Sequence, residues 1–220
     1  MVRQERAVRT RSALIESAAE LFDRDGFEAT SLSTISALAG VSNGALHFHF
    51  ASKAALADAV GQEALRRLEW VVEQRAEDGL QVLIDATHAL VRSLSFDVVL
   101  RAGFELGDVP GRVATGVSLR RRWQEWVEET LVRAEREGSL ASGIAAQDVA
   151  ATVVAVTVGL KTLGSQDAMW LSRGTLTRFW ALLLPRLAEP SALRVLVTSG
   201  TSFGPPPTGP STVPAPVHAP

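Results

Sequence analysis

The stretch "GVSNGALHFHFASKAAL", residues 40–56, contains two histidines, His47 and His49, one residue apart and flanked by phenylalanines. In a β-strand, side chains at i and i+2 point to the same face, so two imidazoles at this spacing could bind one metal ion. In an α-helix the same side chains lie about 200° apart and cannot share an ion. The chemistry of this segment therefore depends on its secondary structure.

Helix signals on both sides of the histidines favour the helix. A short helix is predicted over 31–39, where Gly40 ends it, and another over 43–50, where Ser42 supplies the N-cap. Two short helices joined by a Gly-Val-Ser turn form a helix-turn-helix, whose second helix enters the major groove of DNA. The glycine is expected because the turn requires a left-handed backbone. We therefore predict a DNA-contacting surface, with no metal site and no cofactor.

The rest of the chain predicts an all-α protein. Arg3, Arg6, Arg9 and Arg11 form a basic arm that leads into a first helix, which Gly26 stops. A long fourth helix begins at the Ser52 cap. Including it, further helical patterns cover 52–76, 79–93, 96–106, 118–137, 147–164 and 172–188. No segment shows sustained alternation of polar and apolar residues, so no sheet is expected.

These elements divide the chain into three parts. Residues 1–51 are predicted to be an N-terminal three-helix DNA-binding domain that contains the helix-turn-helix. Residues 52–192 are predicted to form a C-terminal helical domain for ligand binding and dimerisation. Residues 193–220 are rich in proline and small residues. Such a segment buries too little apolar surface to offset its ordering entropy, so we predict a disordered tail.

Composition excludes several classes of protein. The chain has 220 residues, is 46% apolar and contains no cysteine, which excludes disulfides, thiolate metal sites and a cysteine nucleophile. It has no N-terminal apolar segment of the secretory type and no uninterrupted apolar run of 18 residues. The expectation is a soluble cytoplasmic protein with no membrane partner. The net charge of −2 does not decide the question of nucleic-acid binding, because the placement of charge matters more than its sum.

The placement of charge favours DNA. From Ala29 through Ala57 there is no Asp or Glu, and Lys53 is the only Lys or Arg. Acidic residues flank this window on both sides, at Glu28 and Asp58. A surface that lies against phosphates should exclude carboxylates. A short, well-packed core segment could also lack acids, but here the window coincides with the helix-turn-helix.

The segment "ATSLSTISALAGVSNGALHFHFASKAALADAV" resembles the DNA-binding domain of TetR-family transcriptional repressors. The resemblance rests on the Gly-Val-Ser turn, the Gly-Ala-Leu and His-Phe of the recognition helix, and the Ser-Lys that opens the next helix. It is specific over about residues 8–60. The Phe-His-Phe ending and "VVLRAGFEL", residues 98–106, resemble the γ-butyrolactone receptor group of actinomycetes. The resemblance implies a homodimer that releases DNA when it binds a small signal.

One position departs from the family pattern. The family usually has tyrosine where this chain has His47, and the chain contains no tyrosine. "GALHFHF" is similar to the pseudo-receptor branch of the group, whose members respond to antibiotics. The implied effector is therefore a γ-butyrolactone-type signal or an antibiotic.

The outer face of the predicted recognition helix carries residues suited to DNA. Asn43 could pair with adenine in the major groove, Gly44 allows close backbone approach, and His47 could donate to a phosphate in place of the tyrosine. Phe48 either meets a thymine methyl group or packs on the first helix. Lys53 is a candidate phosphate anchor. The predicted DNA-contacting residues are Thr30, Ser31, Ser42, Asn43, Gly44, His47, Phe48 and Lys53.

The effector pocket is predicted in the C-terminal domain. The Glu125-Trp126 pair resembles the pair whose tryptophan seals the ligand pocket in the receptor group, and Trp123 shares its helical face. A stripe of apolar residues on the preceding helix would form the opposite wall, and His88 is either a pocket polar group or a core residue. Plain core packing is the alternative for each tryptophan. The predicted pocket residues are Trp126, Phe96, Leu100, Phe104, Trp123 and His88.

The last two helical patterns, 147–164 and 172–188, are apolar on most sides, as in "VAATVVAVTVGL" and "FWALLLPRL". Such helices need cover from more than one neighbour, which pairing with a symmetry mate would provide. A two-fold dimer would present two recognition helices about 34–36 Å apart to a pseudo-palindromic double-stranded operator.

The predicted function is a non-enzymatic, homodimeric DNA-binding repressor that a small-molecule effector releases from its operator. The resemblance implies control of antibiotic biosynthesis. Two alternatives remain: a DNA-binding regulator with a vestigial pocket and no effector, and a helical enzyme or metal carrier that uses its histidines. The helical phase of His47 and His49 argues against the second.

Overall fold

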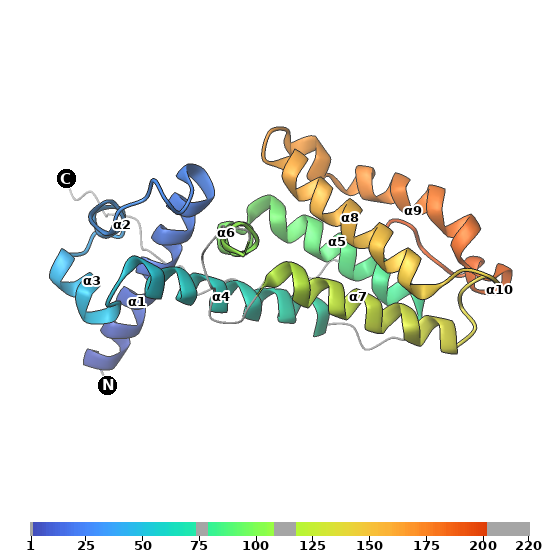
Figure 1. Cartoon of the computed structure of the whole chain (residues 1–220), viewed down its shortest axis with the longest axis horizontal. Helices are drawn as coiled ribbons and strands as arrows, with labels where there is room; N and C mark the ends of the chain where they lie inside the picture. The colour runs from blue at the N-terminus through green and yellow to red at the C-terminus, as the bar shows by residue number, and fades with distance from the viewer. Residues whose placement is uncertain (1, 74–78, 108–117, 202–220) are drawn as a thin grey trace, which may run out of the picture.

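The computed structural model describes residues 2–73, 79–107 and 118–201. It consists of helices, and the described residues contain no strand beyond one isolated β-bridge between Leu140 and Ala188. Figure 1 shows two parts placed end to end, with one long helix running from the first part into the second. The all-α prediction is confirmed.

The first part contains α1 (Val2–Asp25), α2 (Leu32–Leu38) and α3 (Asn43–His49). The two short helices are set by local capping, because the hydroxyl of Ser31 accepts a hydrogen bond from the backbone N–H of Thr34, and that of Ser42 accepts one from Ala45. Between them Gly40 has φ +66°, which favours glycine. The helix-turn-helix therefore follows the turn predicted from the sequence.

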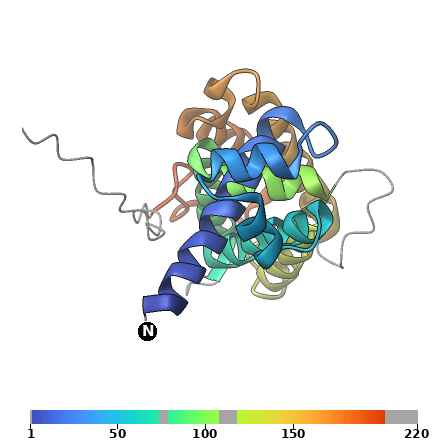
Figure 2. The same ribbon diagram turned by 90° about the vertical axis from the view of Figure 1, so that its left-hand side faces the viewer.

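The predicted basic arm is part of a helix. Helix α1 begins at Val2, so the segment expected to lead into the helix already belongs to it. Figure 2 views the DNA-binding part end-on and shows the first turns of α1 extending beyond the neighbouring helices. Farther along, Leu14, Ile15, Ala18 and Phe22 are buried in the core that α1 shares with later helices. Long helices gain most of their stability from such packing, so α1 is held by its second half.

The second part is a helical bundle entered by α4 (Lys53–Glu73). It continues with α5 (Leu80–Phe96), α6 (Val98–Leu106), α7 (Leu119–Arg136), α8 (Ala146–Gly164) and α9 (Arg173–Leu187). Two short elements, η1 (Ala168–Leu171) and α10 (Pro190–Leu193), were not predicted. The predicted end of the fourth helix, near residue 76, lies outside the described residues. Helix α7 packs on α8, which in turn packs on η1.

Helix α6 joins the two parts, because it packs on both α1 and α4. Its approach to α4 depends on Gly103, where an added Cβ atom would lie 2.3 Å from the Cβ of Ala64. No pair of real side chains tolerates that distance, so only glycine fits this crossing. In Figure 1 α6 is seen end-on between the DNA-binding part and the bundle.

Charged side chains reinforce this junction. The guanidinium of Arg67 on α4 contacts Glu16 of α1 at 2.5 Å and Asp97, the N-cap of α6, at 2.7 Å. Burial alone would lower the pKa of Arg67, but Asp97, Glu16 and Glu63 outweigh it and hold that pKa above its usual range. One turn into α6, Arg101 forms an ion pair with Asp23 of α1 at 2.9 Å. Three helices thus meet around two arginines.

The predicted disordered tail is wrong for residues 193–201. This segment, the C-terminal strap, folds back on α5. There Gln81 accepts a hydrogen bond from the backbone N–H of Val197 at 2.8 Å, and Asp85 accepts one from that of Thr201 at 2.8 Å. The strap orders because buried polar groups of α5 need partners, which composition alone does not reveal. Residues 202–220 lie outside the described residues.

Candidate DNA-binding surface and effector cavity

The recognition helix α3 presents the predicted face to solvent. Asn43, Gly44, His47 and Phe48 are exposed, Phe48 to 83%, whereas Leu46 on the opposite face is fully buried. Phe48 therefore does not pack on α1. Of the two roles that the sequence left open for it, its exposure favours contact with DNA. An exposed phenylalanine in an acid-free window is suited to the thymine methyl groups and sugars of the major groove.

A hydrogen bond orients Asn43. Ser36, buried on α2, has its hydroxyl oxygen 2.6 Å from Oδ1 of Asn43, which lies at the start of α3. The same oxygen lies 3.0 Å from the carbonyl oxygen of Ser33. The small side chain of Ser36 thus allows α2 and α3 to approach and also fixes the amide group that faces outward.

Lys53 lies at the start of α4 with its ammonium group turned toward the α1–α2 connection. Nζ donates to the carbonyl oxygens of Phe27 at 2.8 Å, Glu28 at 3.2 Å and Thr30 at 3.0 Å. It also lies 4.4 Å from the centre of the Phe27 ring. An ammonium group has three donors, and three carbonyl groups occupy them here. In this arrangement Lys53 ties the chain before α2 to α4.

The two predicted residues before α2 differ in their surroundings. Thr30 is buried, and its hydroxyl donates to the carbonyl oxygen of Gly26 at 2.8 Å. Ser31 is exposed and caps α2. Ser42 is likewise an exposed cap, and because its oxygen accepts the helix N–H, its own proton remains a donor. Of these three residues, Ser31 and Ser42 are exposed and Thr30 is not.

His47 and His49 follow the helical phase expected from the sequence. His47 is exposed, whereas His49 is half-buried beside the Phe48 ring, with ring centres 5.3 Å apart. Among the described residues no group of three or more His, Cys, Asp or Glu side chains could hold a metal ion.

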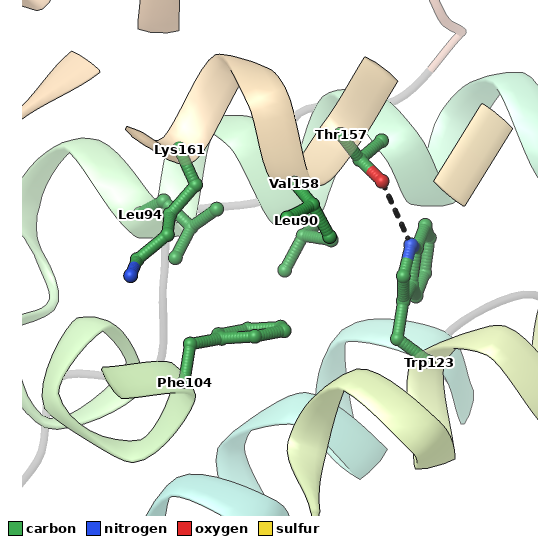
Figure 3. Close-up of a pocket in the computed structure, with 7 residues that line it drawn as sticks. All are labelled: Leu90, Leu94, Phe104, Trp123, Thr157, Val158 and Lys161. Carbon is green, nitrogen blue, oxygen red and sulfur yellow. Dashed lines mark hydrogen bonds between the residues drawn. The ribbon is translucent and has the colours of Figure 1, made fainter. Parts of the chain in front are cut away.

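The bundle contains a small cavity between α5, α6, α7 and α8. Its empty volume is about 200 Å³, which includes the open space at its mouth. The enclosed part of this space is only about 10 Å³, about room for one water molecule, whereas pockets for drug-sized ligands measure about 300–1,000 Å³, so any effector would have to open this cavity. Figure 3 shows the residues that line it. They are Leu90, Leu94, Phe104, Trp123, Thr157, Val158 and Lys161.

Trp123 forms one wall of this cavity. Its Nε1–H donates to the hydroxyl of Thr157 at 2.9 Å, and that hydroxyl lies 2.9 Å from the carbonyl oxygen of Val153, to which it can donate. Both polar groups are buried and satisfied. Because these polar groups bond to each other and to the backbone, this wall of the cavity offers a ligand mainly apolar surface.

Two of the six predicted pocket residues, Phe104 and Trp123, line the cavity. Trp126 is half-buried and stacks on Trp123, with ring centres 5.4 Å apart, but it does not line the cavity. Phe96 is 49% exposed, and Leu100 is fully buried elsewhere in the core.

His88 also lies apart from the cavity. Its Nε2 lies 2.9 Å from the carbonyl oxygen of Thr198 in the C-terminal strap. The sequence prediction missed Lys161 as a lining residue. The signal that could have found it is a lysine, one of only two in the chain, in the last turn of a largely apolar helix.

The exposed, acid-free face of α3 and the helical bundle joined to it by α4 define a DNA-binding regulator of the helix-turn-helix class. Residues 14–60 match the family of bacterial regulatory proteins named tetR. The A-factor receptor protein of Streptomyces griseus is 30% identical over 204 residues, which cover 91% of this chain and 71% of the receptor. The chain belongs to the TetR family of transcriptional regulators, within its γ-butyrolactone receptor group.

Solved structures agree with this assignment. A γ-butyrolactone receptor described as an ArpA-like protein superposes with a TM-score of 0.74 at 30% identity, covering 88% of this chain and 95% of that chain. CprB from Streptomyces coelicolor, solved in complex with its biological operator sequence, gives a TM-score of 0.73 at 32% identity and covers 86% of this chain and 93% of its own. The predicted family is therefore confirmed.

Proposed function

We propose that this protein is a homodimeric repressor that binds a pseudo-palindromic operator and leaves it when a small molecule binds the bundle. The observation that carries the proposal is the outward, acid-free face of α3 at one end of α4, with an apolar cavity at the other part of the molecule. Relatives described as γ-butyrolactone receptors and one solved on its operator support it. We propose that it acts in the cytoplasm on double-stranded DNA and has no enzymatic role.

We propose that Asn43 contacts bases, while Ser31, Ser42 and His47 donate to phosphates. Phe48 would contact a thymine methyl group. Lys53 and Thr30 act indirectly, because their polar groups hold the connection before α2. Residues 1–51 would serve as the DNA-binding domain and 52–192 as the effector and dimer domain, to which the C-terminal strap is added.

The proposed dimer interface is the outer face of α8 and α9. Helix α8 is long and apolar enough, by composition alone, to cross a membrane, yet only 33% of its most apolar window is buried. Its exposed side includes Ala151 and Ala155, and α9 exposes Leu182 to 80%. An apolar face of this kind is expected to be covered, and a second copy supplies an identical face in a two-fold dimer.

The test is a gel-shift titration on the promoter next to the protein's own gene. The protein should bind as a dimer, and a γ-butyrolactone or an extract of the producing culture should release it. If the protein binds the promoter but neither the γ-butyrolactone nor the extract releases it, the result favours a regulator with a vestigial pocket. The small volume of the cavity favours that alternative. Absence of any specific shift, on this promoter and on randomised duplexes, would refute DNA binding.

A further inference from the structure

Lys161 is the only charged residue among the described side chains that line the cavity. It lies on α8, and its side chain is only 11% exposed. Figure 3 shows it extending from α8 toward Phe104 of α6. Its partner is the carboxylate of the adjacent Glu105, also on α6. The Lys161 side chain is largely covered, and its ammonium group is stabilised there by a negative partner at the edge of the cavity.

The two members of the ion pair differ in exposure. The Glu105 side chain is 54% exposed, so water solvates it readily if it leaves the pair, whereas the Lys161 side chain, 11% exposed, has less access to water. A carboxylate that enters the cavity could therefore replace Glu105 at little cost. Neutral acceptors such as hydroxyl groups would replace it less well, because they do not compensate the charge.

We propose that the effector is an amphipathic acid: its apolar body opens and fills the cavity beside Trp123, and its carboxylate replaces Glu105 as the partner of Lys161. This inference rests on the proposed function and names the ligand class for the same site. The apolar wall favours a ligand with an apolar body, and the ammonium group of Lys161 favours a negatively charged group at the end of that body.

Replacement of Glu105 by the effector would also couple effector binding to the DNA-binding part. Glu105 and Arg101 lie one turn apart on α6, and Arg101 is paired with Asp23 of α1. In this structure α6 is thus bound to α8 on one side and to α1 on the other. An acid bound at Lys161 breaks the ion pair between α6 and α8, so α6 can shift together with α1 and α4. An effector releases DNA only if it binds that shifted state more tightly.

The proposal can be tested with two matched probes, octanoate and 1-octanol, whose binding to the full-length protein is measured by calorimetry. Octanoate should bind about tenfold or more tightly than 1-octanol, as expected for a charge-assisted contact. Lys161→Met keeps the apolar stem and should abolish the difference. Glu105→Gln removes the competing carboxylate and should strengthen octanoate binding. Arg136→Met, which removes an exposed charge at the end of α7, is the control and should change neither affinity.

Equal affinity for the two probes, binding of neither, or a preference that survives Lys161→Met would overturn the proposal. If Lys161→Met melts early, the Glu105→Gln variant decides: unchanged octanoate affinity there contradicts the exchange. A gel shift separates this proposal from the proposed function. Octanoate should release operator from the unaltered protein but not from Lys161→Met. If the protein binds its operator but only a neutral lactone releases it, the proposed repressor function stands and the proposal of an acidic effector is refuted.

Discussion

The hydroxyl group of Ser36 has one proton and two oxygen atoms within reach. Oδ1 of Asn43 is the nearer, at 2.6 Å, and the carbonyl oxygen of Ser33 lies at 3.0 Å. If the proton goes to the nearer oxygen, the Asn43 amide presents its NH₂ group to DNA. An NH₂ group alone suits the two acceptors on a guanine edge, whereas adenine requires an amide oxygen as well.

This arrangement predicts a change of base preference. In a selection from randomised duplexes, the unaltered protein should prefer an acceptor-rich edge at the position facing Asn43. Ser36→Ala frees Oδ1 and should shift that preference toward adenine, and Asn43→Ala should lose about 1–3 kcal/mol of discrimination. Ser33→Ala, which removes a neighbouring exposed hydroxyl, is the control. The orientation of Asn43 by Ser36 would be disproved if Ser36→Ala and Ser33→Ala selected the same sites as the unaltered protein.

Lys53 predicts an effect on stability that a phosphate anchor would not have. Lys53→Met should leave three carbonyl groups before α2 without their donor and should destabilise the protein by about 1–3 kcal/mol. DNA binding should weaken in parallel. Thermal melting of Lys53→Met and of Arg9→Ala, which removes an exposed charge from α1, provides the measurement. Equal melting temperatures, together with a shallower salt dependence of DNA binding for Lys53→Met, would show instead that Lys53 contacts phosphates.

At the scale of elements, the crossing of α6 over α4 depends on one missing methyl group. Gly103→Ala would place a Cβ atom 2.3 Å from that of Ala64, so the two helices must separate. The expected loss is about 1–3 kcal/mol in the free energy of unfolding, as for other overpacked cores. Since α6 also packs on α1, the spacing of the recognition helices should change, and operator affinity should fall.

Gly61, on the same α4, provides the control. Nothing lies within 4 Å of a Cβ atom added there, so Gly61→Ala should stabilise the helix by up to about 1 kcal/mol. Denaturant unfolding of both variants gives the comparison. Equal stability of the two variants would show that the crossing tolerates a methyl group.

The elements differ in how far sequence could predict them. Helices α2 and α3 are set by their own caps and by Gly40, so the pattern located them and the outward face of α3. The cavity is formed by residues from four helices, so helical stripes on single elements could not identify it. The sequence predicted a shared stripe for Phe96, Leu100 and Phe104, but Phe96 ends α5 while the other two lie on α6, and of the three only Phe104 lines the cavity.

At the scale of the whole molecule, the proposed dimer can be disrupted without unfolding the chain. Leu182 is 80% exposed in the single chain, so Leu182→Asp should leave the fold intact and yield a monomer with greatly weakened operator binding. Val195→Asp, at 77% exposure in the C-terminal strap, is the matched control and should remain dimeric. Light scattering on a sizing column distinguishes them. A dimeric Leu182→Asp protein would place the interface elsewhere.

The C-terminal strap has a consequence for the order in which the protein can complete its fold during synthesis. The hydrogen bond from Thr201 to Asp85 spans 116 residues, so α5 leaves the ribosome long before this bond to its buried carboxylate can form. The helix-turn-helix, by contrast, is held by contacts close in sequence and can form early. A nascent chain would therefore hold an organised DNA-binding end while the bundle is still open around Asp85 and His88. The bundle reaches its final packing only when the last described residues are released.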